Sequence, residues 1–299
     1  MKSSDTPNTP GFFLESLRFL ARPFFGKGYW GRPGLRTIAA WYRRAYRPES
    51  VMVEGHKLYL NRDDMVLNSY LAVHGYWEKM ETDMVHRYVK PGMQVLDIGA
   101  NIGYHTILMA GLVGEKGRVI AFEPDVTNFN LLGRSVAELP FRNVQIAQAA
   151  VWDTSGELQL YMSEENPGDH QVYHSSEARA HYSVPAVTID EYLPDGKFDF
   201  LKMDIQGAEG HAFMGMRKTL ERHPPTAMVL EFWPGGLATA GTPADEVYAF
   251  LLGLGYVTYR MDEEEQKIYP ITLEQIIAFC DLDWKFVTLL CAQKGHEPV

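Results

Sequence analysis

The 299-residue chain has little of several features that would assign it to particular protein classes. It has two cysteines, Cys280 and Cys291, both in apolar surroundings, which favours buried thiols over a disulfide framework or a cysteine-ligated metal. No apolar run approaches the ~18 residues of a membrane-spanning helix, and the opening MKSSDTPNTPG lacks the charged start and apolar stretch of a signal peptide. We therefore expect a cytoplasmic protein.

Positive charge is scarce outside the N-terminal part of the chain. The whole chain has a formal charge of −10, yet residues 1–50 hold nine Lys and Arg against three acidic residues, which leaves −16 on the remainder. Surfaces that bind nucleic acid are basic because they neutralise phosphates. The acidic body therefore disfavours a nucleic-acid partner.

Residues 12–47 interleave aromatic side chains with arginines, and glycines and prolines divide this segment into two short expected helices. Two interpretations remain open. Aromatic and basic residues together suit peripheral contact with an anionic membrane surface, which would place the protein at an inner membrane face. Alternatively, the segment is a helical lid that packs on the body of the protein.

The most informative stretch is VLDIGANIGYHT at residues 95–106. Its first residues form a short apolar strand, Gly99 and Gly103 permit a tight turn, and a helix is expected over 102–112. A second strand at 118–122 ends at Glu123, where a carboxylate can accept hydrogen bonds from both hydroxyls of a ribose. The pattern predicts a nucleotide-type pocket.

Helices and strands alternate along the rest of the chain. Before the turn we expect a hairpin over 51–60 and helices over 64–90. After it, the expected strands are 143–147, 150–153, 157–162, 184–189, 198–204, 227–232, 256–260 and 286–292, and the helices are 125–139, from 208 onward, and 243–254. This alternation predicts an α/β fold with a mostly parallel, doubly wound sheet.

Two segments are expected to be loops. Residues 163–182 hold three histidines, His170, His174 and His181, and Pro167-Gly168 argue against the helix that would align these side chains on a metal. We therefore expect exposed loop histidines. The second segment, 233–242, is expected to be a flexible loop because of Gly235-Gly236.

Four acidic residues, Asp97, Glu123, Asp204 and Glu231, end the expected central strands. In a doubly wound sheet the ligand lies at these carboxyl ends. A pyrophosphate would be repelled by Asp97, and the turn lacks the G-x-G-x-x-G spacing, which argues against NAD. A sulfonium with an amino group suits an acidic rim, so we expect S-adenosylmethionine as the cofactor.

Several motifs together resemble the FkbM family of S-adenosylmethionine-dependent methyltransferases. They are residues 95–106, Ala121–Pro124 with Asn128, Ala149–Val151, Val187–Asp190 and Leu201–Glu209, and the resemblance covers roughly residues 75–235. It implies a class I methyltransferase (Rossmann-like) sheet of seven strands with an antiparallel last pair. It also implies that the cofactor is contacted by Asp97, Gly99, Ala100, Asn101, Gly103, Tyr104, Glu123, Pro124, Asn128, Ala150, Val151 and Asp204.

One departure from the family pattern affects catalysis. The family usually reads Asp-x-Glu-Gly-x-Glu where this chain has Gln206, and an amide cannot act as a general base. The base role therefore falls to Asp204, Glu209 or His105, with Asp204 first because it ends a strand beside the expected cofactor. Asp204 as a helix cap and His105 as a polar contact are the alternative roles.

Asp204 and Glu231 also end neighbouring expected strands, a placement similar to the metal-binding acids of catechol-type methyltransferases. The residues after Glu231, Phe232-Trp233-Pro234, supply no further ligand, so we expect no metal.

The resulting division of the chain is a basic and aromatic helical extension (1–50), a hairpin and helices that lead into the core (51–92), and an S-adenosylmethionine-binding methyltransferase domain (93–299). The expected activity is O-methylation of a hydroxyl on a sugar, glycoconjugate or related natural product. An N-methyltransferase is an alternative, although the expected fourth strand lacks the Asn/Asp-Pro-Pro-Tyr/Phe sequence of an amino-group pocket. A non-catalytic S-adenosylmethionine-binding protein is another.

Overall fold

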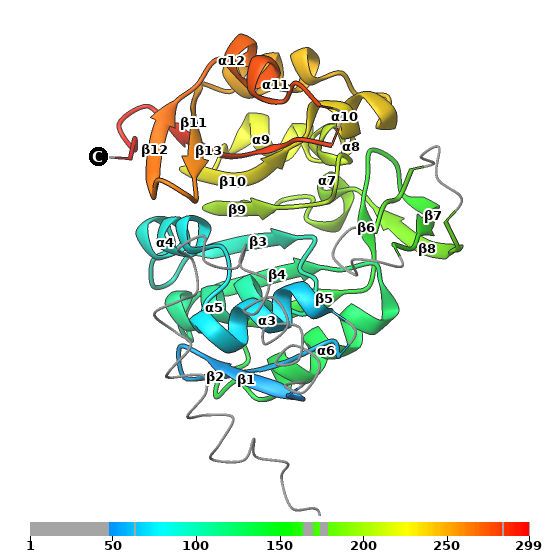
Figure 1. The fold of residues 1–299 in the computed structure, drawn as a ribbon, viewed down its shortest axis with the longest axis vertical. Helices are drawn as coiled ribbons and strands as arrows, with labels where there is room; N and C mark the ends of the chain where they lie inside the picture. The colour runs from blue at the N-terminus through cyan, green and yellow to red at the C-terminus, as the bar shows by residue number, and fades with distance from the viewer. Residues whose placement is uncertain (1–47, 63, 164–169, 174–178, 283, 299) are drawn as a thin grey trace, which may run out of the picture.

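The computed structural model describes residues 48–62, 64–163, 170–173, 179–282 and 284–298 (Figure 1). The basic and aromatic segment at 12–47 lies outside these ranges, so its expected helices stay a prediction. Within the described ranges, no helix combines the length and the apolar character that crossing a bilayer requires.

The first described elements are a hairpin and two helices, as expected. Strands β1 (Ser50–Val53) and β2 (His56–Tyr59) form an antiparallel hairpin, with Glu54 and Gly55 at positive φ in its turn. Helices α3 (Met65–His74) and α4 (Lys79–Tyr88) follow. The hairpin lies against α6 (Val126–Ala137), where the backbone N–H of Tyr59 donates to Ser135 Oγ at 3.0 Å.

A central sheet organises the molecule, and within the described ranges it has eight strands in the order β12-β11-β13-β10-β9-β3-β4-β5. The strands are β3 (Gln94–Ile98), β4 (Arg118–Phe122), β5 (Val144–Ala147), β9 (Phe200–Met203), β10 (Ala227–Phe232), β11 (Tyr256–Asp262), β12 (Lys267–Pro270) and β13 (Val287–Gln293). Strands β5, β4, β3, β9 and β10 are parallel, and β13 is antiparallel between β10 and β11. The doubly wound α/β class is confirmed.

The sheet has one strand more than the family resemblance implies. Strand β11 extends to Asp262, and the chain turns back at 263–266 so that β12 pairs with it in an antiparallel hairpin. Residues 267–270 are only four residues long and end in a proline, so they are not recognised as a strand without this partner.

Helices cover both faces of the sheet, and successive strand residues alternate between two cores. On β3, Val95 belongs to the core formed with α4 and α5 (Tyr104–Val113), whereas Leu96 belongs to the core formed with α8 (Glu209–Gly215) and α11 (Ala244–Gly253). The remaining helices are α7 (Ile189–Tyr192), α9 (Arg217–Arg222), α10 (Pro234–Ala240) and α12 (Leu273–Phe279). The alternation follows from the two-residue period of a strand.

Three strands that the sequence pattern assigned to the core form a separate sheet instead. They are β6 (Ala150–Val151), β7 (Gly156–Tyr161) and β8 (His181–Val187), in the order β6-β8-β7. This sheet lies beside the carboxyl ends of the central strands (Figure 1). Its β7–β8 pair is antiparallel, so these strands do not continue the parallel order of the main sheet.

The flexible loop expected at 233–242 is wrong. Residues 234–240 form α10, which begins at Pro234 and ends at Gly241 with φ of 88°. Proline favours the first turn of a helix because its φ is already helical and its missing N–H is not needed there.

Candidate active site

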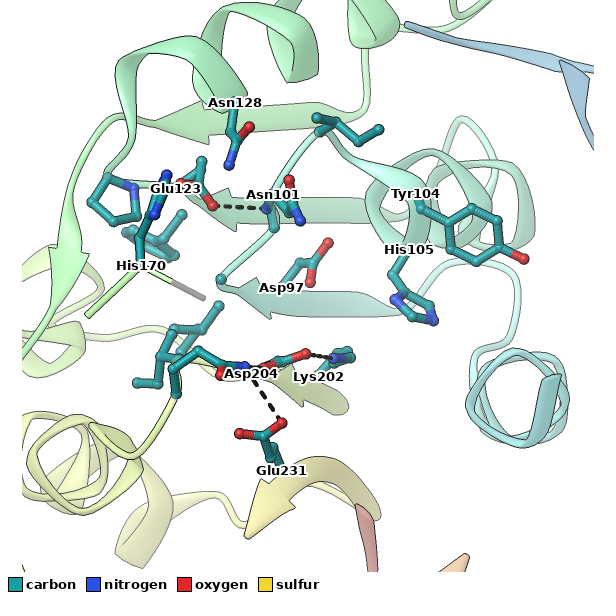
Figure 2. Close-up of a pocket in the computed structure, with 18 of the residues that line it drawn as sticks. Asp97, Asn101, Tyr104, His105, Glu123, Asn128, His170, Lys202, Asp204 and Glu231 are labelled. Atoms are coloured by element: carbon teal, nitrogen blue, oxygen red, sulfur yellow. Dashed lines mark hydrogen bonds and ion pairs between the residues drawn. The ribbon is translucent and has the colours of Figure 1, made fainter. Parts of the chain in front are cut away.

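A cavity of about 270 Å³ opens at the carboxyl ends of β3, β4 and β9 (Figure 2). All of the expected cofactor-contacting residues line it except Gly103. Gly103 has φ of +95°, and a Cβ there would lie 2.6 Å from Leu132 Cδ1 on α6. Gly103 therefore allows the turn to pack against α6, and its expected contact with the cofactor stays a prediction.

Gly99 packs directly against Asp204, the residue that follows β9. Its φ is +81°, and a Cβ at this position would lie 1.9 Å from the backbone oxygen of Asp204. The N–H groups of Gly99 and Ala100 both donate to the carbonyl of Phe122, at 3.0 and 2.9 Å. Only glycine fits this position, and its packing fixes Asp204 directly beside the turn.

Glu123 lies at the end of β4 with both carboxylate oxygens hydrogen-bonded to backbone. Oε2 accepts the N–H of Asn101 at 2.7 Å, and Oε1 accepts the N–H of Asp125 at 2.9 Å. Burial raises the pKa of Glu123 to about 8. Each oxygen keeps a lone pair for a further donor, which is the arrangement that a pair of ribose hydroxyls needs.

Asp97 lies in β3, one residue before the strand ends, and it is almost fully buried. Its Oδ2 accepts a hydrogen bond from Thr106 Oγ1 at 2.5 Å. Burial raises the pKa of Asp97 to about 6, so the carboxylate is mainly ionised at neutral pH. A buried anion in this place suits a cationic ligand group better than a phosphate.

Asp204 follows β9, and each of its two carboxylate oxygens has a side-chain partner (Figure 2). Oδ2 pairs with the ammonium of Lys202 at 3.1 Å, and Oδ1 accepts Gln206 Nε2 at 2.8 Å. The ammonium of Lys202 also lies 3.3 Å from Oε2 of Glu81 on α4. Burial alone would lower the pKa of Lys202, but the charges of Asp204 and Glu81 outweigh burial and raise it well above its usual value.

Sequence reasoning missed Lys202, although one signal was available: it is a lysine in the otherwise apolar strand 200–203. A charged residue in a buried strand requires a partner of opposite charge. Asp204 lies two residues further along the chain, but the second partner, Glu81, could not be identified in advance because it is far away in the sequence.

Gln206 occupies the position between the two acids that the sequence suggested as a metal pair. With φ of 56°, it directs Nε2 toward Asp204 Oδ1 and toward Glu231 Oε2, the latter at 3.4 Å. The hydroxyl of Tyr173 donates to the backbone oxygen of Gln206 at 2.6 Å. An amide NH₂ group between the carboxylates supplies hydrogen-bond donors where a shared metal ion would have to lie.

The two remaining base candidates differ in their placement. Glu209 is fully buried, does not line the cavity, and accepts the N–H of Ile205 at 3.1 Å. This hydrogen bond stabilises the loop that follows β9. Burial raises the pKa of Glu209 to about 7. His105 lines the cavity from α5, and burial holds its pKa well below the usual value, so the imidazole is neutral.

The loop histidines lie only partly within the described residues. His170 lines the cavity, and its Nδ1 accepts the N–H of Ser163 at 3.0 Å. His181 is exposed, as expected, but it is the first residue of strand β8 and does not lie in a loop. His174 falls outside the described residues.

These residues fit S-adenosylmethionine. Glu123 suits the ribose, the Gly99 turn lets the ligand approach the backbone, and Asp97 with Asp204 suits the cationic methionine part. A sheet of this order with such a rim defines a class I methyltransferase domain.

The sequence pattern of the Methyltransferase FkbM domain matches residues 97–258, which is more than half of the chain. The chain belongs to the FkbM family of methyltransferases, and its methyl donor is S-adenosylmethionine.

Two curated relatives are similar to part of the chain. The Protein-L-isoaspartate O-methyltransferase 1 of Arabidopsis thaliana is 28% identical over 121 residues, which is 38% of this chain and 47% of that protein. The Protein-L-isoaspartate O-methyltransferase of Thermotoga maritima is 28% identical over 102 residues, which is 32% of this chain and 30% of that protein. The chain thus spans less than half the length of either relative.

Among solved structures, the Methyltransferase FkbM from Methylobacillus flagellatus KT has a TM-score of 0.43 at 17% sequence identity, covering 88% of this chain and 60% of that chain.

Proposed function

We propose that the chain transfers the methyl group of S-adenosylmethionine to a hydroxyl group of a sugar, glycoconjugate or related natural product. The observation that carries the proposal is Asp204, a cavity-lining carboxylate packed beside the Gly99 turn and oriented by Lys202 and Gln206. A hydroxyl of high pKa needs its proton removed during attack, and a positioned carboxylate meets that need.

When bound, the sulfonium supplies an activated methyl group with a good leaving group. The protein then has two tasks, which are to orient the acceptor oxygen and to receive its proton. Asp204 receives the proton, because both of its oxygens retain a lone pair beyond their existing hydrogen bonds. Lys202 and Gln206 fix the orientation of this carboxylate, and Glu123 and Asp97 hold the ribose and the cationic part of the donor.

Aromatic side chains at the cavity support a carbohydrate or ring-shaped acceptor. Trp77 and Phe286 both line the cavity, and Phe286 remains 50% exposed. Sugar rings present an apolar face that stacks on such side chains. The acidic body of the chain disfavours a nucleic-acid acceptor, and the two curated relatives carry O-methyltransferase in their names, which supports oxygen over nitrogen as the accepting atom.

The test combines calorimetry with S-adenosylmethionine and transfer of labelled methyl groups to a panel of methyl glycosides, polyketide-type alcohols and amines. Asp204→Asn should lower turnover on the responding hydroxyl acceptor by about 10²- to 10⁴-fold and leave donor affinity nearly unchanged. Asp281→Asn is the matched control, because Asp281 also pairs with a lysine, Lys285, but on the exposed surface. Unchanged turnover in Asp204→Asn would remove Asp204 from the mechanism, and donor binding without transfer to any acceptor would favour a non-catalytic binding protein.

A further inference from the structure

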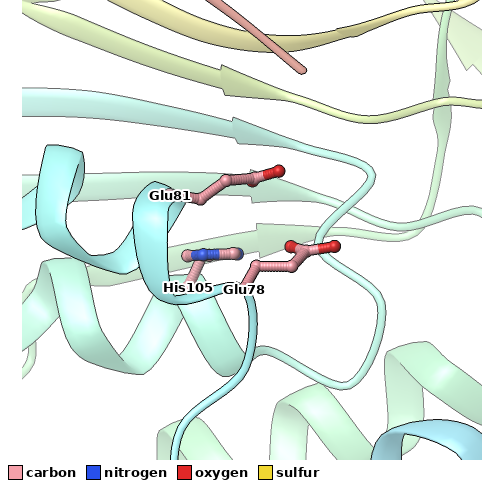
Figure 3. Close-up of side chains that lie close together, drawn as sticks. All are labelled: Glu78, Glu81 and His105. Carbon is pink, nitrogen blue, oxygen red and sulfur yellow. The ribbon is translucent and has the colours of Figure 1, made fainter. Parts of the chain in front are cut away.

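Three potential ligand groups lie close together at the wall of the cavity (Figure 3). They come from Glu78 just before α4, Glu81 on α4, and His105 on α5. One carboxylate oxygen of each glutamate and one ring nitrogen of His105 lie within 4.8 Å of one another. In Figure 3 the two carboxylates and the imidazole face the same small space.

Negative charge is in excess around this space. Glu78, Asp204 and Glu231 line the cavity, and Glu81 lies 3.3 Å from the ammonium of Lys202. When the four carboxylates are ionised, the single ammonium leaves three negative charges uncompensated among these groups. Burial raises the pKa of Glu78 well above its usual value, and the nearby charge of Glu81 raises it further. A cation bound between the carboxylates of Glu78 and Glu81 would relieve the repulsion between these two like charges.

The side chain of His105 favours a metal ion over a proton as the group that lies between the two carboxylates. The side chain is 7% exposed, and its Nε2 has no hydrogen-bond partner among the described residues. Burial and the charge of Lys202 both lower its pKa, so the ring is neutral and carries a lone pair suited to a metal. A buried imidazole nitrogen without a partner costs free energy, and a coordinated ion would remove that cost.

We propose that Glu78, Glu81 and His105 bind one divalent metal ion that accepts mixed nitrogen and oxygen ligands, such as Mn²⁺ or Zn²⁺, at the wall of the cavity. An imidazole with two carboxylates is a mixed nitrogen and oxygen donor set, which suits Mn²⁺ or Zn²⁺ better than Mg²⁺ or Ca²⁺, since these prefer oxygen ligands alone. The site is separate from the Asp204 and Glu231 pair, where Gln206 intervenes. The proposal concerns metal binding and does not depend on the identity of the methyl acceptor.

Binding is tested with the full chain after treatment with a chelator, by titration with Mn²⁺ and detection of free Mn²⁺ by electron paramagnetic resonance. The wild-type chain should bind one Mn²⁺, and an excess of Mg²⁺ should not displace it. His105→Gln and Glu81→Gln should each weaken binding by at least about tenfold. His86→Gln is the matched control, because His86 contacts an exposed glutamate, Glu54, at 2.7 Å outside the cavity, and it should bind like the wild type.

The site is overturned if the wild type binds no Mn²⁺, or if both His105→Gln and Glu81→Gln retain the wild-type affinity. Calorimetry with S-adenosylmethionine shows whether each variant is folded. If a variant fails to fold, paramagnetic broadening of the His105 ring resonances in the wild type gives the same answer, and unbroadened resonances with Mn²⁺ bound would refute the site. Metal binding and methyl transfer are measured separately, so failure of one does not imply failure of the other.

Discussion

Replacement of Glu123 by glutamine tests the cofactor site most sharply. The two carboxylate oxygens accept the N–H groups of Asn101 and Asp125 at 2.7 and 2.9 Å. A glutamine presents its NH₂ group to one of these donors, so one hydrogen bond is lost and a contact to the ribose is lost with it. A hydrogen bond to a charged group contributes about 1.5–3 kcal/mol, so Glu123→Gln should weaken nucleoside binding by roughly 10- to 150-fold.

The same carboxyl group predicts a pH dependence. Burial raises the pKa of Glu123 to about 8, and ribose hydroxyls bind its ionised form. As the pH falls below about 8, the free protein takes up a proton at Glu123, and ligand affinity should fall by up to about tenfold per pH unit. As the pH rises above this value, affinity should level off.

The assay is calorimetry with 5′-methylthioadenosine, which has the ribose but no titratable amino acid part, between about pH 6 and about pH 9. The wild type should show the loss of affinity toward low pH, whereas Glu123→Gln should bind weakly at every pH. Glu138→Gln serves as the control, because Glu138 is exposed and pairs with Lys57 on the surface. Binding by the wild type that does not change with pH, or the same slope in Glu123→Gln, would refute the assigned role.

Three further results are expected. Gly99→Ala should lower the midpoint of urea unfolding and weaken donor binding. The φ of +81° costs an alanine about 1–2 kcal/mol, and the methyl group would lie 1.9 Å from the backbone oxygen of Asp204. An unfolding curve equal to that of the wild type would contradict this packing. Cys291 is fully buried, and burial raises the pKa of its thiol, so a thiol reagent should modify it only after unfolding, and rapid modification of the native protein would show that this strand opens. For residues 12–47, the full chain should sediment with anionic liposomes more than a chain that starts at Ser50, and equal sedimentation would exclude membrane contact through this segment.

Local patterns were sufficient for the elements around the cofactor turn. The strand expected at 118–122 coincides with β4, and the helix expected over 102–112 differs from α5 by at most two residues at its ends. These segments combine a continuous apolar run with glycine at both ends of the turn, so propensity and burial favour the same structure.

Elements that depend on a distant partner could not be predicted in the same way. Strand β12 exists because it pairs with β11, and the small β6-β8-β7 sheet is separate because its strands pair among themselves. Gly99 and Gly103 carry the same sequence signal, yet Gly99 packs on Asp204 and Gly103 on Leu132. A glycine pattern predicts a turn, but the neighbour that approaches it is set by the tertiary fold.

In the candidate site, too, the sequence predicts the residues at the strand ends but not the contacts that depend on helix packing. Asp97, Glu123 and Asp204 were predicted because parallel strands bring their carboxyl ends to one edge of a sheet. The ion pair between Lys202 and Glu81, and the convergence of His105 with Glu78, arise from the packing of α4 and α5 near that edge. No spacing within the sequence specifies which residues of two helices will meet.

We propose that this cavity methylates a hydroxyl oxygen, and the carbon-13 chemical shift of the transferred group tests this proposal most directly. S-adenosylmethionine labelled at its methyl carbon is incubated with the full chain and the responding acceptor, and the product is examined by NMR. The proposed function predicts the signal of a methyl ether, absent in Asp204→Asn. A signal from an N-methyl group or a methyl ester, or an equal ether signal in Asp204→Asn, would contradict it.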